Sequence, residues 1–416
     1  MRTKEFSHND QLTAEQLVKQ RHYERVCAYI DLDAILYNMR NMHAHLPKET
    51  MITAVVKTDG YGHGSVAIAK ALEPEDYVWG YATATEEEAM QLRDAGLKKP
   101  IIILGYSFPY AYDDIAKQEI RPAVFSVEMA KELSEAAVRN GKEINIHIKV
   151  DTGMGRIGVR PDESGLQIVR TIANLPGLVT EGIFTHFAKA DETDKTHTQE
   201  QYRKFTEFTA RVEQMLGRKI PIHHCANSAG IVDLPQMHLT MVRAGITLYG
   251  LWPSDEVNRE AVALKPVMSI KSHVVYIKKL RAGETVSYGG TYTAPNDRIV
   301  ATIPVGYGDG YPRGLSGKGC VLVNGRRCPI LGRVCMDQFM ADITDVPDVS
   351  VGTEVTLIGT DGTQQLTMEE LGALSGRFNY ELACDIGKRV PRVFVKDGNA
   401  VAYKDYYEDV PTVYTE

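Results

Sequence analysis

An eightfold alternation of short apolar segments with helical patterns, between residues 51 and 250, constrains the fold of this chain more than any other feature. Parallel strands that are covered by helices read as short, nearly continuous apolar runs, and their connections need helical crossovers. Eight such units close into a (β/α)8 barrel of the TIM-barrel type, an α/β architecture. The eight strands are predicted at residues 54–56, 77–82, 101–104, 122–125, 144–150, 182–186, 222–226 and 241–245.

Local signals place helices around these strands. Thr85, followed by Glu88 three residues later, is a capping-box pattern that starts a helix after the second barrel strand. Asn140 and Gly141 form a typical helix stop. Helices are predicted over residues 13–21, 33–46, 126–139, 165–174 and 198–216.

Beyond about residue 265 the pattern changes to strands separated by Gly, Asn and Asp turns. Asn324 and Gly325 are a strong signal for a β-hairpin. Only residues 367–374 look helical in this part, where Thr367 and Glu370 form a second capping-box pattern. We expect a mainly β domain with strands within residues 268–280, 297–307, 318–334 and 352–360.

The chain therefore divides into three parts. Residues 1–25 are an N-terminal extension, residues 26–262 are the barrel domain, and residues 263–416 are the mainly β C-terminal domain. A further strand is predicted over residues 26–32, ahead of the eight barrel strands. Its place is left open: it either joins the barrel domain or packs with the β domain.

Charge and cysteine usage exclude several classes of function. The net charge of −7 leaves no basic stripe to neutralise phosphates, so we expect no nucleic acid partner. No apolar run is long enough to span a bilayer, and the start of the chain lacks the apolar core of a signal peptide, so we expect no membrane partner. Six scattered cysteines without a CxxC pair fit reduced thiols in the cytoplasm. His223, His224 and Cys225 lack a second ligand pair at zinc-finger spacing, so we expect no metal.

Lys57 is the first candidate for chemistry. It follows the apolar run 54–56, and Gly60, Gly62 and Gly64 come within the next seven residues. A lysine at the carboxyl end of a barrel strand lies where barrel enzymes place catalytic groups. A partly desolvated lysine there can lose its proton and form a Schiff base. The alternative is a lysine that only extends from a strand end into solvent.

Other barrel strands also end in polar groups. The carboxyl ends of parallel barrel strands meet at one face, where the active sites of this fold lie. A serine hydroxyl, together with backbone N–H groups next to a glycine, can hold a phosphate. Taken singly, Ser228 also reads as a helix cap, His186 as a packed core histidine and Arg243 as a surface cation. The residues that gather at this face are Lys149, Arg156, His186, Asn227, Ser228, Arg243, Gly245 and Ile246.

The segment AVVKTDGYGHG (54–64) resembles the pyridoxal-phosphate attachment motif of the bacterial alanine racemases. Thr58 and Gly60 stand where that family commonly has alanine. The segments KVDTGMGRIG (149–158), TVSYGG (285–290), GYGDGYPRG (306–314) and GRVCMDQ (332–338) match the family in the same order. The resemblance covers nearly everything after about residue 27. It implies a fold-type III enzyme, a barrel followed by a β domain.

The resemblance also implies roles toward pyridoxal 5'-phosphate. Lys57 would carry the cofactor, Arg243 would bond its pyridine nitrogen, and Arg156 its phenolic oxygen. Lys149 matches a position that is often carbamylated in the family, where the new carboxylate positions Arg156. The remaining cofactor-binding residues, most of them at the phosphate, would be Tyr61, His186, Asn227, Ser228, Gly245, Ile246 and Tyr380.

The implied reaction is the interconversion of L-alanine and D-alanine through an aldimine with the cofactor, which supplies D-alanine for cell-wall peptidoglycan. Freed Lys57 would move the proton on the D-face and Tyr288 on the L-face. Tyrosine has an ordinary pKa near 10, so we expect a nearby cation, His186 or Arg243, to help Tyr288 act as a base. In the family this tyrosine serves the partner's active site, which implies a homodimer with shared sites. Residues at or near the substrate would be Arg156, Tyr307, Arg313, Arg333, Met336 and Asp337.

Three other functions remain open at this point. A serine or broad-specificity amino-acid racemase would share the fold, although serine racemases of this kind tend to have a smaller polar residue at Tyr380 and usually carry a membrane domain. A basic amino acid decarboxylase shares the barrel-plus-β plan, but the Tyr288 motif disfavours it. A non-catalytic pyridoxal-phosphate-binding protein would be essentially a bare barrel, without the β domain that bears Tyr288.

Overall fold

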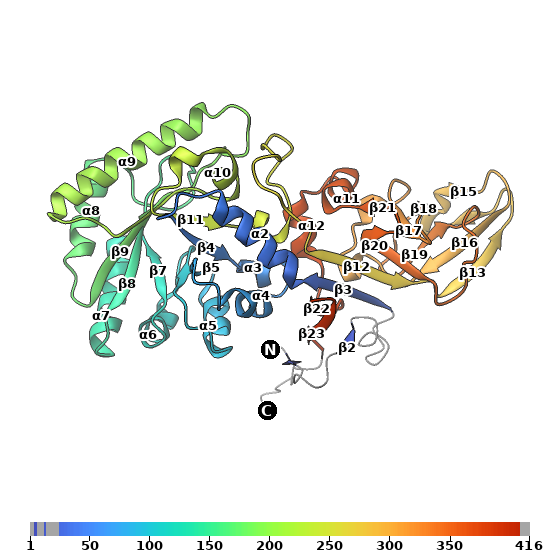
Figure 1. The fold of residues 1–416 in the computed structure, drawn as a ribbon, viewed down its shortest axis with the longest axis horizontal. Helices are drawn as coiled ribbons and strands as arrows, with labels where there is room; N and C mark the ends of the chain where they lie inside the picture. Colours follow the sequence, from blue (N-terminus) through green and yellow to red (C-terminus); the bar gives the residue numbers. More distant parts are fainter. Residues whose placement is uncertain (1–3, 6–11, 14–24, 408–416) are drawn as a thin grey trace. The chain divides into compact units, whose positions relative to one another are not determined.

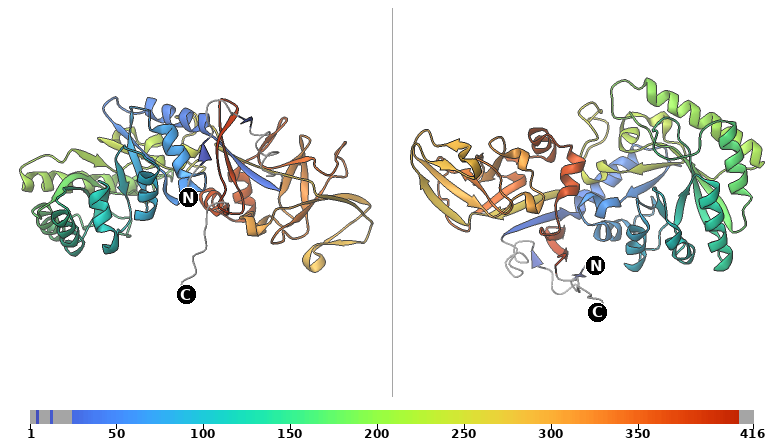
Figure 2. Two further views of the ribbon diagram at one scale, coloured as in Figure 1. Left: turned by 90° about the horizontal axis from the view of Figure 1, so that it is seen from below. Right: turned by 180° about the vertical axis from the view of Figure 1, so that it is seen from behind.

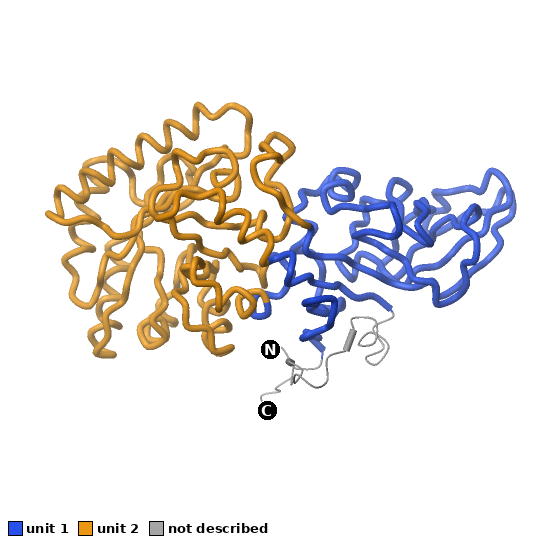
Figure 3. The backbone as a smooth tube through the Cα atoms, in the orientation of Figure 1, with its two compact units in different colours: residues 1–35, 61–67, 266–416 blue, residues 36–60, 68–265 orange. Residues whose placement is uncertain are grey.

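The computed structural model describes residues 4–5, 12–13 and 25–407 of the 416-residue chain. Contacts divide the chain into two compact units (Figure 3): unit 1 comprises residues 1–35, 61–67 and 266–416, and unit 2 comprises residues 36–60 and 68–265. The helix predicted over residues 13–21 lies outside the described residues, apart from Thr13 at the end of strand β2. Within the described residues, no helix is long and apolar enough to cross a membrane.

Unit 2 contains the predicted barrel (Figures 1 and 2). Its parallel strands close on themselves in the order β10-β11-β4-β5-β6-β7-β8-β9, and helices α5 to α9 lie outside them. Each predicted barrel segment overlaps an observed strand, so the (β/α)8 fold is confirmed. The strands are β4 (Met51–Val55), β5 (Val78–Thr83), β6 (Ile101–Ile103), β7 (Arg121–Val124), β8 (Ile144–Lys149), β9 (Leu178–Phe184), β10 (Ile222–His224) and β11 (Met241–Ala244).

The helices of this part follow from their capping and spacing. Ser126 caps α7 by accepting a hydrogen bond from Met129 N–H, and the buried Met129, Ala130, Leu133 and Ala137 recur at helical spacing along one face. The helices that lie wholly or partly in unit 2 are α2 (Leu32–Ala44), α3 (Lys57–Tyr61), α4 (Ser65–Leu72), α5 (Glu86–Asp94), α6 (Tyr112–Lys117), α7 (Val127–Arg139), α8 (Glu163–Ala173), α9 (Thr196–Leu216) and α10 (Ser228–Asp233).

Unit 1 is built on a 13-stranded sheet, whose main path is β1-β23-β22-β3-β12-β20-β17-β18-β19-β16-β13. Strand β3, the segment whose place was left open, pairs with β12 and β22 in this sheet. Strands β14 and β15 form a separate two-stranded ribbon. The strands are β1 (Lys4–Glu5), β2 (Leu12–Thr13), β3 (Val26–Asp31), β12 (Met268–His273), β13 (Tyr276–Leu280), β14 (Thr285–Val286), β15 (Tyr292–Thr293), β16 (Arg298–Ile303), β17 (Cys320–Val323), β18 (Arg326–Leu331), β19 (Phe339–Asp342), β20 (Glu354–Asp361), β21 (Gln364–Leu366), β22 (Arg392–Lys396) and β23 (Asn399–Lys404).

Turn and helix predictions in unit 1 were partly right. Asn324 and Gly325, at φ 49° and 72°, join β17 to β18 as the predicted hairpin. Helix α11 (Met368–Ser375) matches the predicted helix. The expectation of a single helix in this part is wrong, because α12 (Asn379–Asp385) follows it. Helix α12 has only 7 residues, and its N-cap Phe378 makes no side-chain capping bond, so neither periodicity nor capping marks it in the sequence.

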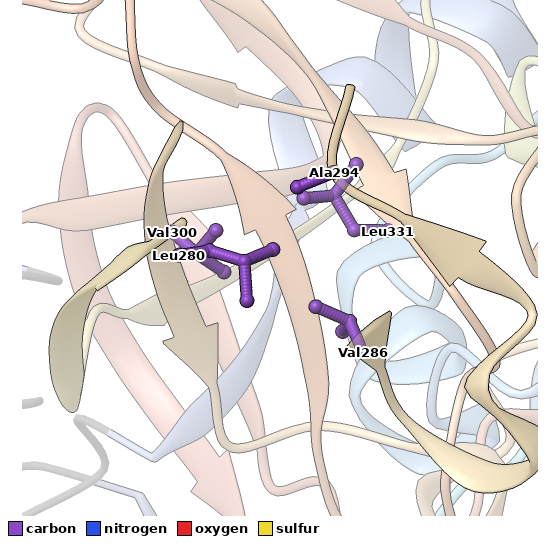
Figure 4. Packing of buried hydrophobic residues seen from close by; sticks show 5 residues of the cluster. All are labelled: Leu280, Val286, Ala294, Val300 and Leu331. Atoms are coloured by element: carbon purple, nitrogen blue, oxygen red, sulfur yellow. The ribbon is translucent and has the colours of Figure 1, made fainter. Parts of the chain in front are cut away.

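A small apolar cluster holds the β14–β15 ribbon (Figure 4). Leu280, Val286, Ala294, Val300 and Leu331 are buried together and contribute from β13, β14, the end of the ribbon, β16 and β18. Burying a side chain such as Val286 contributes about 1.5–3 kcal/mol. Since Val286 stands two residues before Tyr288, this packing positions the turn that carries the tyrosine.

Candidate active site

Lys57 stands at the start of a left-handed turn. Strand β4 ends at Val55, and helix α3 then runs through Thr58, Asp59 and Gly60 at φ 53°, 49° and 64°, with Tyr61 at φ 50°. A hydrogen bond from Gly60 N–H to Val56 O (2.8 Å) closes the turn. Left-handed backbone costs a non-glycine residue roughly 1–2 kcal/mol, so the turn stores strain next to the lysine. The sequence predicted a tight glycine-rich turn here, but not its handedness.

Glu88 links this turn to the neighbouring barrel strand. Its Oε1 accepts from Thr58 N–H (2.6 Å), and its Oε2 accepts from Ala84 N–H (2.8 Å), directly after β5. Thr85 caps α5 as predicted, by accepting from Glu88 N–H at 3.4 Å. In a complete capping box the Glu88 side chain would accept from Thr85 N–H. Here it accepts from Thr58 N–H and Ala84 N–H instead. The amide next to Lys57 is therefore held by a carboxylate on α5.

We expect Glu88→Gln to loosen this turn. Glutamine offers one oxygen acceptor in place of two, so either Thr58 N–H or Ala84 N–H loses its partner, at a cost of about 1 kcal/mol in unfolding free energy. Hydrogen–deuterium exchange of the peptide 57–61, read by mass spectrometry, should accelerate. The control is Glu87→Gln, because Glu87 bonds the Tyr110 hydroxyl (2.6 Å) instead. Equal exchange in both variants would show that Glu88 does not hold the turn.

Ser228 and the residues after β11 form a hydroxyl and N–H cradle. The Ser228 hydroxyl accepts from Gly245 N–H (3.0 Å) and lies 2.9 Å from the Thr247 hydroxyl. Ile246 begins the following 3₁₀ turn. The helix cap of α10 is Asn227, whose side chain accepts from Gly230 N–H (3.0 Å). Ser228 is therefore not a cap, and its hydroxyl faces the turn at Gly245.

Arg243 lies inside the barrel rather than on the surface. It is 2% exposed, and its Nη2 donates to Thr185 O (2.9 Å) and Cys225 O (3.1 Å). His186 Nδ1 lies 3.3 Å from the same nitrogen. Burial lowers the pKa of Arg243 to about 10, so the guanidinium keeps its charge at neutral pH. Burial and the charge of Arg243 hold the pKa of His186 well below its usual value, so this ring is neutral at pH 7.

Lys149 ends β8 in the same part of the barrel. The side chain is 2% exposed, and its Nζ donates to Val150 O (2.7 Å). Burial, opposed by the charge of Asp151 and assisted by those of Arg243 and Arg156, lowers the pKa of Lys149 to about 7. The amine is therefore largely neutral above pH 7. Arg156 lies in the loop after β8 and is exposed.

Two of the predicted cofactor-binding tyrosines meet within unit 1. The rings of Tyr61 and Tyr380 lie 6.1 Å apart in an edge arrangement, and Phe378 stacks on Tyr380 at 4.5 Å. A Cβ at Gly62 would lie 2.2 Å from Ala383 O, so only glycine lets the chain after Tyr61 approach α12 this closely. Tyr380 is on the helix that the sequence did not predict.

Backbone groups and serine hydroxyls join the predicted substrate-side segments by hydrogen bonds in unit 1. Ser287, beside Tyr288, donates to Arg333 O (2.7 Å), while Tyr307 N–H donates to Cys335 O (3.0 Å). The Ser316 hydroxyl links the turn of Arg313 to this segment by donating to Arg313 O and accepting from Val334 N–H. Tyr288 is 71% exposed, and Tyr307, Arg313, Arg333, Met336 and Asp337 are exposed as well.

Comparison with known proteins decides the family. The family model of the alanine racemase N-terminal domain matches residues 30–253, and that of the C-terminal domain matches residues 267–394. This chain belongs to the alanine racemase family. Alanine racemase 1 of Clostridium acetobutylicum is 45% identical over 386 residues, 93% of this chain and 99% of that protein. The alanine racemase of Clostridium tetani is 44% identical over 387 residues, 93% of this chain and 99% of that protein.

Solved alanine racemases share the fold of this family member. The Clostridium difficile 630 enzyme has a TM-score of 0.87 and 38% identity, and the match covers 92% of this chain and 98% of that one. The Bacillus anthracis alanine racemase with bound L-Ala-P has a TM-score of 0.86 and 37% identity, and the match covers 93% of this chain and 99% of that one. The likeness extends over both the barrel and the β domain.

Sequence reasoning missed three polar residues inside the barrel of this racemase-family chain: His147, Glu181 and His224. Both histidines are fully buried, and they connect Glu181 to Arg243. A polar side chain in a strand that is covered on both faces needs a buried partner. His147 in the run INIHIK and His224 in IHH carry that signal in the sequence.

Proposed function

We propose that this chain is an alanine racemase that interconverts L-alanine and D-alanine with pyridoxal 5'-phosphate. The observation that carries the proposal is the position of Lys57 at the end of β4, in a unit whose other strand ends hold the Ser228–Gly245 cradle and the buried Arg243. An amine, an anion-binding turn and an internal cation fit a cofactor that has an aldehyde, a phosphate and a ring nitrogen. Bound pyridoxal phosphate would supply an electron sink that acidifies the α-proton of the amino acid.

In this proposal the chain holds each end of the cofactor with different residues. Lys57 would attach it covalently, and the Ser228 hydroxyl with the N–H groups of Gly245 and Ile246 would bind the phosphate. The family resemblance adds Tyr61 and Tyr380 as phosphate ligands, and Asn227 and His186 as close neighbours. Arg243 donates to the ring nitrogen, and Arg156 to the phenolic oxygen.

Arg243 has a chemical consequence in this scheme. A guanidinium donates a hydrogen bond without giving up its proton, so Arg243 would leave the ring nitrogen of a bound cofactor unprotonated and make the ring a weaker electron sink. Rapid return of the proton to Cα follows, with little transamination. We expect Arg243→Glu to raise the ratio of transamination to racemisation, measured as pyruvate formed per D-alanine formed. An unchanged ratio in that variant would contradict this role.

Two groups on opposite faces move the proton in this proposal. Lys57 Nζ takes or returns it on the D-face, and the Tyr288 hydroxyl does so on the L-face. His186 is neutral, so Arg243 is the remaining candidate for the cation that stabilises the deprotonated form of Tyr288. The high exposure of Tyr288 in the single chain supports a homodimer in which the partner subunit's Tyr288 completes each site.

Lys149 is proposed to carry a carbamate that positions Arg156. Carbon dioxide reacts with a neutral amine, and the lowered pKa of Lys149 makes that form abundant near neutral pH. With ¹³C-bicarbonate, the wild-type chain should show a carbamate carbon signal by NMR that grows as the pH rises through 7. Lys149→Arg serves as the control and should lack the signal. A wild-type spectrum identical to that of Lys149→Arg would refute the modification.

A chiral assay tests the proposed function. Purified protein with pyridoxal phosphate is given L-alanine and L-serine separately, and the D-enantiomers are measured by chiral chromatography. Rapid conversion of alanine with little conversion of serine is expected. Comparable rates on both substrates would make the chain a broad-specificity or serine-directed racemase. No turnover of either, with cofactor bound, would favour a binding protein. Supply of D-alanine for peptidoglycan in the cytoplasm is the proposed role.

A further inference from the structure

A series of hydrogen bonds, here called the relay, runs from Arg121 through Glu181, His147 and His224 across the interior of the barrel and ends at Arg243. Arg121 Nε donates to Glu181 Oε2 (2.8 Å), and the same carboxylate oxygen lies 3.1 Å from His147 Nε2. His147 Nδ1 lies 2.9 Å from His224 Nε2, and His224 Nδ1 lies 2.8 Å from Arg243 Nη1. Both imidazoles are completely buried, and the relay connects residues of β7, β9, β8, β10 and β11 in turn.

Only one assignment of protons to the two histidine rings satisfies every hydrogen bond of the relay. A guanidinium can only donate, so His224 Nδ1 must accept from Arg243. The neutral His224 ring then carries its proton on Nε2 and donates to His147 Nδ1. His147 in turn carries its proton on Nε2 and donates to Glu181. Burial lowers the pKa of both histidines, so two neutral rings are expected at pH 7.

The strands are built to keep the two rings in this arrangement. A Cβ at Gly182 would lie 2.2 Å from His147 Nδ1, so glycine at this position makes room for the contact between the rings. Phe184 stacks on His224 with centroids 4.6 Å apart and an interplanar angle of 5°. Trp79 packs edge-on against His147 at 6.2 Å. The rings therefore have little freedom to rotate.

We propose that Glu181, acting through His147 and His224, is a positioning residue that fixes the orientation and donor pattern of Arg243. Its carboxylate accepts from His147 Nε2–H and so stabilises, from the other end, the same tautomers of His147 and His224 that the Arg243 donor requires. The Glu181 carboxylate is itself paired with Arg121, so its effect on Arg243 passes through the hydrogen bonds of the relay. The consequence for catalysis rests on the proposed function, in which Arg243 holds the cofactor ring. The relay itself does not.

The first test uses the chain without cofactor. Selective ¹⁵N-histidine labelling and NMR report the protonation of each ring nitrogen, and His147→Gln and His224→Gln assign the two signals. The wild-type chain is expected to show both rings neutral with the proton on Nε2 at pH 7 and above. In Glu181→Ala the His147 Nε2–H group loses its acceptor, so its ¹⁵N and ¹H signals should shift. Wild-type rings with the proton on Nδ1, or unchanged ring signals in Glu181→Ala, would overturn the relay.

The second test uses the cofactor-loaded enzyme and a matched pair. Glu181→Ala is expected to lower kcat for alanine about tenfold, with little change in KM, and to change the absorbance of the bound cofactor. The control is Glu213→Ala, because Glu213 bonds His223 (3.0 Å), on the same strand as His224 but outside the relay. Equal losses in both variants, or no loss in Glu181→Ala, would refute the positioning role. Conversely, an inactive wild-type chain would refute the proposed function and leave the NMR result to decide the relay.

Discussion

The Lys57→Ala chain is expected to racemise alanine at least about 10⁴-fold more slowly than the unsubstituted chain. The substitution removes the amine that attaches the cofactor and, in the same atom, the group that moves the proton on the D-face. Chiral chromatography measures the rate, and the absorbance of the reconstituted protein reports cofactor attachment separately.

Lys48→Ala is the matched control, because Lys48 is an exposed lysine in the turn before β4. It should keep the full rate and the normal absorbance. Racemisation by Lys57→Ala within about tenfold of the control would mean that another group attaches the cofactor and moves the proton. The left-handed turn at residues 58–61 would then need a different explanation.

Tyr288→Phe is expected to lower racemisation by about 10²–10⁴-fold, because it removes only the hydroxyl that moves the proton on the L-face. Cofactor attachment should survive, since Lys57 is unchanged. Tyr292→Phe, in β15 of the same ribbon, controls for effects on packing and should stay close to the wild-type rate. A Tyr288→Phe chain with wild-type kinetics would exclude the tyrosine as the second acid/base.

The same variant tests whether sites are shared between subunits. When Lys57→Ala and Tyr288→Phe chains are unfolded and refolded together, random pairing should restore about a quarter of the sites in a homodimer with shared sites. Each mixed dimer then has one site with both residues intact. No recovery, once mass spectrometry has verified mixed dimers, would place Tyr288 in the site of its own chain.

The barrel could be predicted from sequence because its signal is repeated and local. Each of its strands is a short apolar run, and helices such as α5 and α7 begin with capping residues that act within a single turn. Helix α12 could not be predicted, since its seven residues have no capping bond at Phe378 and gain their stability from tertiary contacts. Residues 26–32 read as a strand, but which sheet they join depends on distant pairing with β12 and β22.

The candidate site was predictable as a set of polar strand ends, but its supporting contacts were not. The sequence placed Lys57, Ser228 and Arg243 at one barrel face, and the structure brings Ser228 to Gly245 and buries Arg243. The left-handed turn could not be predicted from sequence, because Thr58 disfavours that backbone and Asp59 adopts it only occasionally and as a single residue. The bonds of Glu88 and the relay from Glu181 join residues far apart in sequence, and only the packed barrel shows them.

Incubation with L-alanine in deuterium oxide tests racemisation by Lys57 and Tyr288 from opposite faces of the substrate. Chiral separation with mass spectrometry follows deuterium at Cα of each enantiomer at low conversion. We expect that D-alanine forms and carries deuterium from the first turnovers, while the remaining L-alanine keeps its original hydrogen. Absence of D-alanine, or D-alanine that retains the substrate hydrogen, would contradict it.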